Sequence, residues 1–299
     1  MSTMRLTEHR YGKTGVRLAK VERDGDHHVF HDLTLTLWLE GDFSAAYLRG
    51  DNSTSLPTDT MRASCYAVAA DLPLGETETY LEAVLRRLLS VVPAATSAHG
   101  EARIHSWERI TVESGSHPHA FRSVVGDGTA AVVVRRGAAP TGVDPAEVDA
   151  AGVDAAEVSS GLVDLLVTKT TGSAYAGFLT DDMTVLAETD DRILSTSVDV
   201  GWRWGGGTPA SYAGSRATAR RVVETVFATH HSLAVQQTLY ETGAALLGAL
   251  PEATSVTLRM PNRHHVPVDL TPFGRANRNE VFVVLDRPFG VIEATVERL

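Results

Sequence analysis

A change of hydrophobic period near residue 60 constrains the fold of this chain more than any other feature. Over residues 28–40, apolar and polar side chains alternate, which is typical of an antiparallel strand with one buried face. A polar stretch at 51–60 follows, and Pro57 within it cannot continue a central strand. Apolar residues then recur at helical spacing, and we expect Asp59 or Thr60 to cap that helix. The chain therefore changes from paired strands to helices at this stretch.

The same order of strands and helices is expected in both halves of the chain. In the first half, the patterns predict strands at 11–23 and 28–40, helices at 60–72 and 76–92, and strands at 102–112 and 119–135. In the second half, they predict strands at 162–170 and 193–204, helices at 215–230 and 232–250, and strands at 256–260, 266–270, 281–285 and 291–296. We therefore predict an α+β protein of two tandem units, β-β-α-α-β-β twice, with a helix pair on one face of each antiparallel sheet.

An acidic, alanine-rich segment separates the two halves. Residues 142–148 are echoed at 152–158, and neither copy holds an aromatic residue. Such a segment has little to bury, which favours a solvated linker or surface insertion over a functional acidic segment. We predict a first unit at 1–137, this linker at 138–160 and a second unit at 161–299.

Charge and cysteine content exclude several classes of protein. A formal net charge of −10 disfavours a broad nucleic-acid-binding face. Cys65 is the only cysteine, so no disulfide forms within the chain, which fits a reducing compartment. No apolar run approaches the ~20 residues that a membrane helix needs, and the N-terminus lacks the apolar core of a signal peptide. We expect a cytoplasmic protein that binds neither nucleic acid nor membrane.

The histidines raise the question of a metal site. His27, His28 and His31 lie close together in the sequence, and His117 and His119 could share one face of a strand. No H-E-x-x-H is present, and no carboxylate or cysteine stands at a ligand-like spacing on a helix. Metal binding is therefore the less favoured alternative. The glycine-rich fingerprints of nucleotide sites are also missing, so the motifs indicate no cofactor.

Four polar clusters interrupt the predicted elements. They lie at 11–13, at 58–60, at 190–192 together with Gln236, and at 260–265. A lysine at a strand start, such as Lys13, is usually a solvated edge charge. An arginine in such a place, such as Arg192, is usually part of a surface ion pair. The clusters support a functional argument only in combination.

In combination, these clusters and their neighbours resemble the urate oxidase (uricase) family. The matching motifs are Tyr11-Gly12-Lys13, Gly50-Asp51-Asn52-Ser53, Thr58-Asp59-Thr60, His117-Pro118-His119-Ala120-Phe121, Asp191-Arg192-Ile193-Leu194-Ser195-Thr196, Val235-Gln236, Met260-Pro261-Asn262-Arg263-His264 and Asn279-Glu280-Val281-Phe282. The resemblance runs from about residue 11 to the C-terminus, with a gap only around the acidic segment. It implies two tandem tunnelling-fold units, and a homotetramer with active sites at subunit interfaces. The implied reaction oxidises urate with O₂ to 5-hydroxyisourate and hydrogen peroxide, with neither metal nor organic cofactor.

The resemblance implies four substrate contacts in the second half of the chain. Arg192 and Gln236 would clamp the purine, and Val235 would add a backbone contact. Tyr175 aligns with the family's stacking phenylalanine. The chemistry suits urate, an acidic planar heterocycle, because a guanidinium offers a planar fork and an amide offers both a donor and an acceptor.

The resemblance also implies a relay that draws on a neighbouring subunit. Thr58 and Asp59 would come from that subunit. Lys13, Thr58 and His264 would form the proton relay, and Asn262 with Thr58 would hold O₂ or the nucleophilic water above the ring. Lys13 can accept a proton through the Thr58 hydroxyl only if its surroundings favour the neutral amine.

Two departures from the family pattern leave alternatives open. Tyr175 replaces the phenylalanine, and Arg62-Ala63-Ser64 stands where the family has Lys-Asn-Thr. One alternative is another tunnelling-fold enzyme acting on pterins or purines, such as a cyclohydrolase-like protein, which would need a metal or a glutamate anchor. The other, motivated by Tyr175, is a tetrameric purine-binding protein with weak or no turnover.

Overall fold

The computed structural model describes residues 4–137, 156–205, 207–285 and 287–299, which form two compact units. The first comprises Met1–Ser160 with Ala210–Ala213, and the second comprises Gly161–Pro209 with Gly214–Leu299. The main sheet has the strand order β1-β2-β3-β6-β7-β8-β9-β12, and each unit has its own cluster of buried apolar side chains. The expected α+β fold with antiparallel strands is confirmed.

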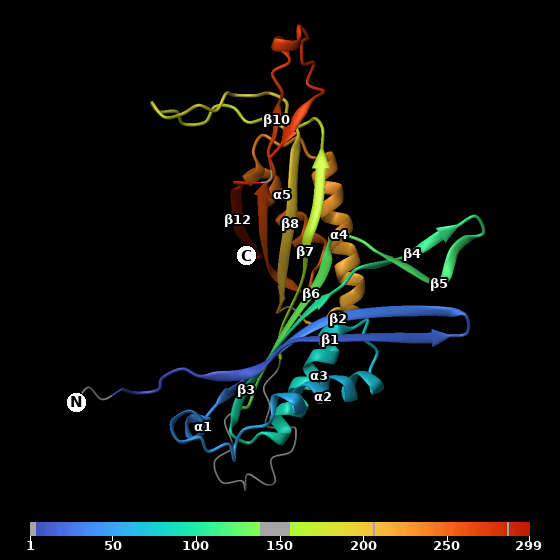
Figure 1. The fold of residues 1–299 in the computed structure, drawn as a ribbon, viewed down its shortest axis with the longest axis vertical. Helices are drawn as coiled ribbons and strands as arrows, with labels where there is room; N and C mark the ends of the chain where they lie inside the picture. The colour runs from blue at the N-terminus through green and yellow to red at the C-terminus, as the bar shows by residue number, and fades with distance from the viewer. Residues whose placement is uncertain (1–3, 138–155, 206, 286) are drawn as a thin grey trace. The chain divides into compact units, whose positions relative to one another are not determined.

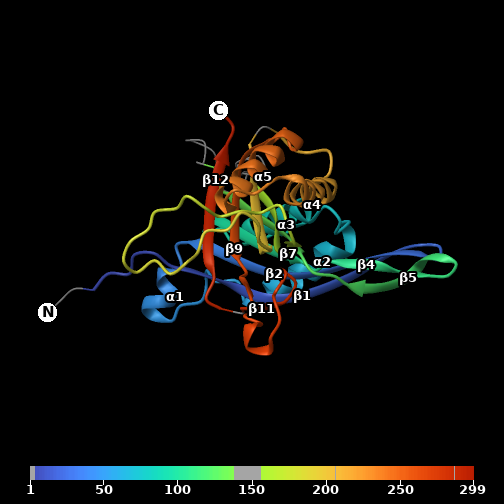
Figure 2. The ribbon, with the colours of Figure 1, turned by 90° about the horizontal axis from the view of Figure 1, so that it is seen from above.

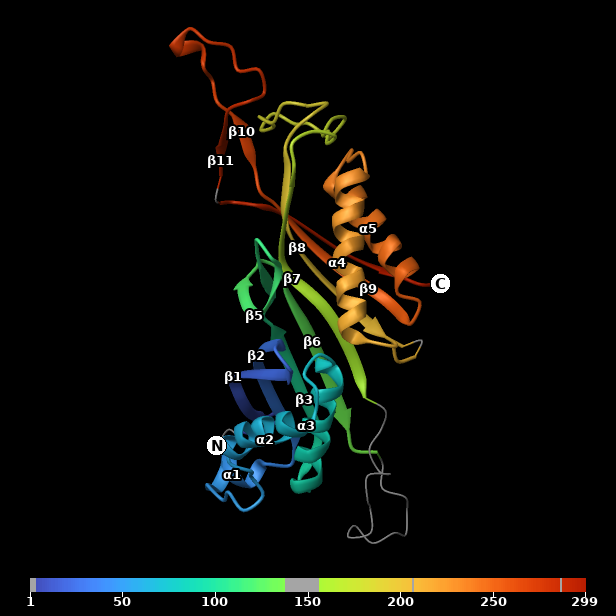
Figure 3. The same cartoon turned by 90° about the vertical axis from the view of Figure 1, so that its right-hand side faces the viewer.

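Four neighbouring strands of the sheet belong to the first unit, in the order β1-β2-β3-β6 (Figure 1). They are β1 (Arg10–Asp24), β2 (His27–Gly41), β3 (Ala95–Ile104) and β6 (Asp127–Arg135). Two helices, α2 (Thr58–Asp71) and α3 (Thr77–Val91), lie on one face of this sheet (Figure 3). A tight turn joins β1 to β2, and in it Gly25 has φ +54°, a left-handed conformation that glycine adopts without strain.

The alternating pattern of β2 buries one face of the strand. Its leucines join the leucines of α3 in one fully buried layer: Leu33, Leu35, Leu37, Leu39, Leu81, Leu85 and Leu88. Burial of a leucine side chain stabilises the folded state by about 1.5–3 kcal/mol relative to its exposure. This layer therefore holds the sheet against the helix pair. Val29, nearer the hairpin, has the same parity in the strand but is 45 % exposed.

Replacement of Leu35 by alanine should test this layer. Leu35→Ala leaves a cavity at a fully buried position, and we expect the free energy of unfolding to fall by about 2–5 kcal/mol. Val29→Ala, in the same strand at an exposed position, should change it by less than about 0.5 kcal/mol. Urea unfolding followed by circular dichroism, at one protein concentration, measures both. Equal losses in the two variants would contradict the layer's role.

The second unit repeats the plan. Its part of the sheet has the order β7-β8-β9-β12, formed by β7 (Glu157–Lys169), β8 (Leu194–Trp204), β9 (Ala253–Asn262) and β12 (Gly290–Glu297). Helices α4 (Tyr212–Thr229) and α5 (Val235–Ala249) lie together on one side of these strands (Figure 2, Figure 3). Because the strands are antiparallel, the end of β7, the start of β8 and the end of β9 meet at one end of the sheet.

Each unit carries a two-stranded ribbon between its third and fourth sheet strands. In the first unit the ribbon is β4 (Trp107–Val112) with β5 (Gly115–Ser123), and in the second it is β10 (His265–Pro267) with β11 (Phe282–Val284). The predictions of single strands at 102–112 and 119–135 are therefore wrong, because each spans a sheet strand and a ribbon strand. A ribbon continues the same alternating period, so the pattern does not show where the chain leaves the sheet.

Three smaller expectations also change. Helix α2 begins at Thr58 with Pro57 as its N-cap and no side-chain cap, so neither Asp59 nor Thr60 caps it. A short helix, α1 (Ser44–Arg49), precedes the polar stretch and was not expected. Strand β7 begins at Glu157, inside the expected linker 138–160, whose residues 138–155 lie outside the described part of the chain. Over the described residues, the helices are too short or too polar to cross a membrane.

Candidate functional site

Lys13 lies next to a bulge near the start of β1. The register of β1 against β2 shifts between Lys13 and Val16, where Gly15 has φ +70°. Gly12 allows the strands to approach closely here, since a Cβ at this position would lie 1.9 Å from the Leu37 carbonyl oxygen. Such bulges re-aim side chains, often next to functional sites. The glycine of the tripeptide Tyr11-Gly12-Lys13 is thus explained by the close approach of β1 to β2, which leaves no room for a side chain.

The Lys13 side chain reaches the first turn of α2. Its Nζ lies 3.0 Å from Oδ1 of Asp59, and Arg62 Nη2 lies 3.5 Å from the same oxygen. The hydrogen bond from Lys13 and the charges of both cations lower the pKa of the exposed Asp59 carboxyl. Asp59 therefore pairs with two cations. One of them, Arg62, is a residue that departs from the family pattern.

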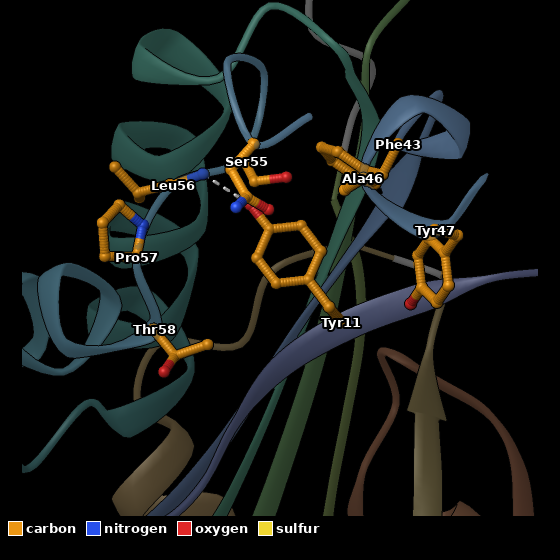
Figure 4. A pocket seen from close by; sticks show the side chains of 9 residues that line it. Tyr11, Phe43, Ala46, Tyr47, Ser55, Leu56, Pro57 and Thr58 are labelled. Carbon is orange, nitrogen blue, oxygen red and sulfur yellow. Dashed lines mark hydrogen bonds between the residues drawn. The ribbon is translucent and has the colours of Figure 1, made fainter. Parts of the chain in front are cut away.

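Thr58 lines a pocket of about 470 Å³ in the first unit (Figure 4). Its lining is mainly aromatic and apolar, with a few polar groups: Tyr11, Phe43, Ala46, Tyr47, Asn52, Ser55, Leu56, Pro57 and Thr58. The Leu56 amide donates a hydrogen bond of 2.8 Å to the Tyr11 hydroxyl, which ties the polar stretch to β1. Burial raises the pKa of that hydroxyl. Lys13, Thr58 and Asp59 thus lie close together in the first unit.

Arg192 and Tyr175 form a cation–π pair in the second unit. The guanidinium carbon lies 5.1 Å from the centroid of the Tyr175 ring, which in turn stacks on Phe178 with the ring centroids 5.0 Å apart. Burial lowers the pKa of the Arg192 guanidinium, and the neighbouring Tyr175 opposes that effect. Arg192 Nε is buried without a hydrogen-bond partner. A buried donor with no partner in the protein is a candidate contact for a ligand.

Val235 and Gln236 are the first two residues of α5. Backbone N–H groups in the first turn of a helix lack intrahelical partners and favour an anion. Val235 is buried, whereas Gln236 is exposed. The segment before them is joined to the segment before Tyr175, because Ser232 N donates to Gly172 O (3.0 Å) and Ala174 N donates to Ser232 O (2.7 Å).

Asn262 and His264 lie where β9 leaves the sheet. Asn262 pairs with Thr196 of β8, and the His264 carbonyl accepts a hydrogen bond of 3.0 Å from the Leu285 amide. Thr196 is fully buried, and its hydroxyl has no partner. Figure 1 shows the base of β10 at the same end of the second unit as the yellow connection between β7 and β8. All six expected residues of this unit thus belong to segments that meet at one end of its sheet.

The predicted residues therefore form two groups rather than one. Lys13, Thr58 and Asp59 belong to the first unit, and the second group belongs to the second unit: Tyr175, Arg192, Val235, Gln236, Asn262 and His264. The second group offers a guanidinium, an amide and a helix N-terminus. Those groups suit a planar anion with several carbonyl and ring-nitrogen edges.

Three histidine side chains of the first unit lie close together. The ring centroids of His28 and His119 lie 5.7 Å apart, and those of His117 and His119 lie 4.6 Å apart. Within the ranges that the structure describes, however, no three His, Cys, Asp or Glu side chains are arranged to hold a metal ion.

Two further residues emerge that the motif reading did not assign. Asp191 accepts hydrogen bonds from Gly172 N (2.9 Å) and from the Thr171 hydroxyl (2.8 Å). Ser232 receives a hydrogen bond of 2.7 Å from the Thr238 hydroxyl of α5. Asp191 stood inside a recognised cluster, so its position gave a signal. Ser232 had none, because its bonds join segments far apart in the sequence.

Comparisons with known proteins agree on one family. The family model described as Uricase matches residues 9–132 and 158–293. A uricase from Arthrobacter globiformis is 38 % identical over 293 residues, which cover 98 % of this chain and 90 % of that protein. A uricase from Aspergillus flavus is 31 % identical, with 97 % of this chain and 95 % of that protein covered.

A solved structure supports the same family. The crystal structure of the uricase from Arthrobacter globiformis superimposes with a TM-score of 0.88 at 36 % identity, and the match covers 99 % of this chain and 96 % of that one. The repeated antiparallel unit with its helix pair is therefore the tunnelling fold that the motifs implied. With a family model over most of its length, close relatives and a matching fold, the chain belongs to the uricase family.

Proposed function

We propose that this chain, a urate oxidase by its family, oxidises urate at a site completed by two subunits of a homotetramer. The second unit of one subunit would supply the substrate clamp, and the first unit of its neighbour would supply Lys13, Thr58 and Asp59. The separation of the predicted residues into two groups, each ordered within its own unit, supports this arrangement. Two incomplete groups of this kind suit a symmetric assembly in which each interface contributes both.

The substrate clamp would bind the urate anion in the plane of its ring. The Arg192 fork would bind a carbonyl and a ring nitrogen, and the Gln236 amide would bind the opposite edge. The free amide of Val235, at the start of α5, would add a backbone donor. Tyr175 would stack on the ring, as the family's phenylalanine does. The observation that carries this proposal is the half-buried Arg192 over Tyr175, with its Nε lacking a partner.

The reaction needs no redox group from the protein if urate itself donates the electrons. Urate, O₂ and water give 5-hydroxyisourate and hydrogen peroxide, so two electrons pass from the purine to O₂. Water adds at C5 of the oxidised ring, and peroxide leaves. The clamp would raise the rate by holding the ring and O₂ in contact, with Asn262 and Thr58 above the ring.

Proton transfer would pass through the first group. Loss of a second proton makes urate a better electron donor. The Thr58 hydroxyl would carry that proton to the neutral amine of Lys13, which must first release its own proton and its ion pair with Asp59. His264 would extend the relay from the clamp side. General base catalysis of this kind contributes about 10²–10⁴-fold to a rate.

One assay tests the function. Purified protein should remove the urate absorbance in air-saturated buffer that contains EDTA, and form an equal amount of hydrogen peroxide. Binding of urate without its loss would instead support a purine-binding protein with weak or no turnover. Activity that EDTA abolishes, together with bound metal on elemental analysis, would favour a metal-dependent enzyme of the cyclohydrolase type.

Replacement of Arg192 tests the clamp. Arg192→Ala removes the fork, and we expect the binding of xanthine, which shares the pyrimidinedione ring of urate, to weaken by about 1.5–3 kcal/mol, the scale for a hydrogen bond to a charged group. Arg192→Lys keeps the charge but not the planar fork, so it should recover only part of that loss. Calorimetric titration of xanthine measures both. Wild-type affinity in Arg192→Ala would contradict the clamp.

The assembly and location follow from the same proposal. A homotetramer should sediment as such, and its dilution to monomer should abolish activity, since each site would draw its two groups from different subunits. Cytoplasmic location is supported by Cys65, a buried free thiol. Activity in a verified monomer would contradict the shared site.

A further inference from the structure

Three segments of the second unit carry the substrate clamp, and hydrogen bonds join two of them to the third, the segment after β7. The segment after β7 carries Tyr175, the segment before β8 carries Arg192, and the segment between α4 and α5 leads to Val235 and Gln236. None of these segments belongs to a sheet strand at the positions concerned. Contacts other than the hydrogen bonds of the sheet must therefore fix the positions of these segments relative to one another.

Asp191 is the residue at which these contacts converge. Its carboxylate accepts hydrogen bonds from the Gly172 amide (2.9 Å) and the Thr171 hydroxyl (2.8 Å). Its backbone carbonyl accepts a hydrogen bond of 2.8 Å from the Thr189 hydroxyl. The next residue, Arg192, donates its amide to the Ser173 carbonyl at 2.7 Å. Asp191 thus fixes Arg192 against the segment that carries Tyr175.

The contact continues from Gly172 to the start of α5. Gly172 has φ +73°, a left-handed conformation that glycine adopts without strain. Its amide is held by Asp191, and its carbonyl accepts from the Ser232 amide (3.0 Å). Ser232 is fully buried, and Thr238 of α5 donates its hydroxyl to the Ser232 hydroxyl at 2.7 Å. These bonds fix the position of Gly172 relative to the helix that begins with Val235.

We propose that Asp191 is a positioning residue that holds Tyr175, Arg192 and the α5 N-terminus in one clamp without touching the substrate. The inference rests on the proposed function, because it assigns those groups to urate binding. Asp191 itself is exposed, and the hydrogen bond from Thr171, followed by the amide of Gly172, lowers the pKa of its carboxyl. The carboxylate is therefore an acceptor across the neutral range.

The test compares Asp191→Ala with a matched aspartate. We expect Asp191→Ala to raise KM for urate and the Kd for xanthine by about ten- to a hundredfold, since a misplacement of about 1 Å costs up to 10²-fold. Asp269→Ala is the control, because the Asp269 carboxylate likewise accepts from a threonine amide and hydroxyl, those of Thr271 (2.9 Å and 2.7 Å), in a segment that carries none of the clamp residues. The control should keep wild-type KM and Kd.

Rescue separates positioning from a general loss of folding. Asp191→Asn can accept from Gly172 and donate to the Thr171 hydroxyl, so its KM should lie close to that of the wild type. A purely structural role would lower the fraction of active protein and leave KM unchanged in the active remainder. Thr171→Val removes one of the two bonds at an exposed position and should raise KM by a smaller factor, which keeps the test available if Asp191→Ala does not fold.

The outcomes distinguish the two proposals. Wild-type KM and xanthine affinity in Asp191→Ala, or an Asp191→Asn variant as impaired as the alanine variant, would overturn the positioning role alone. A wild-type protein that neither oxidises urate nor binds xanthine would overturn the proposed function itself.

Discussion

Lys13→Met should lose turnover and keep its affinity for xanthine. The substitution removes the amine and keeps much of the volume of the side chain. If Lys13 accepts the proton of urate, kcat should fall by about 10²–10⁴-fold, the range for a general base. The clamp lies in the other unit, so the Kd for xanthine should change little. Steady-state kinetics and calorimetry on the same preparation measure the two quantities.

A charge-preserving variant tells a base from an electrostatic contact. Lys13→Arg can still pair with Asp59, which lies 3.0 Å from the Lys13 amine, but a guanidinium does not lose a proton in proteins. We therefore expect Lys13→Arg to be as slow as Lys13→Met. Near-normal turnover in Lys13→Arg would mean that the positive charge matters and the proton transfer does not.

Thr58→Ala extends the same test. If the Thr58 hydroxyl carries the proton to Lys13, Thr58→Ala should resemble Lys13→Met, and the double variant should be little slower than either single one. Residues that act as one unit give non-additive losses. Additive losses would show two independent contributions, and the relay would be wrong even though the enzyme oxidises urate.

Two inactive variants should restore activity to each other when they share a tetramer. In a tetramer that contains Lys13→Met and Arg192→Ala chains, some interfaces join the intact Arg192 of one chain to the intact Lys13 of the other. With random association, about a quarter of the sites are intact in both groups, as follows from the symmetry of the assembly. We expect coexpressed, doubly tagged tetramers to recover activity on that scale.

The control for this experiment is a pair from the same group. Lys13→Met with Thr58→Ala places both defects in the first unit, so every mixed interface lacks one of them and activity should stay low. If the Lys13→Met and Arg192→Ala pair also stays inactive in a verified mixed tetramer, the site lies within one chain. That result would contradict the shared site while leaving the family membership untouched.

The sequence predicted the repeated plan well because its strongest signals are local. The alternation over β2 and the helical stripe of α3 each follow from burial on one face, and the leucines of both are fully buried. The ribbons were not separated from the sheet strands, because Ile110 and Val112 keep the parity of Ala102 and Ile104, although both ribbon side chains are exposed. The helix cap was misassigned because Pro57 begins the turn and Asp59 instead binds Lys13.

The sequence offered candidate site residues but not the contacts that support them. Motifs such as Asp191-Arg192 and Asn262-Arg263-His264 are contiguous, so a family resemblance can find them. The bonds that hold them are not contiguous: Ser232 joins Gly172 only because two connections meet at one end of the sheet. No period or propensity in the sequence encodes that meeting, since it depends on how the strands are ordered.

The direction of β12 has a practical consequence for immobilising the enzyme. Gly290, at the start of this strand, pairs with Asn262, and Glu297, near its end, pairs with Ser255. Over the seven residue-to-residue steps from Gly290 to Glu297, an antiparallel strand rises by roughly 24 Å. A fusion partner or surface tether attached after Leu299 is therefore joined to the second unit at a point far from Asn262 of the same chain. Attachment there is the first choice for a urate sensor, because it leaves the entry to that clamp uncovered by its own anchor.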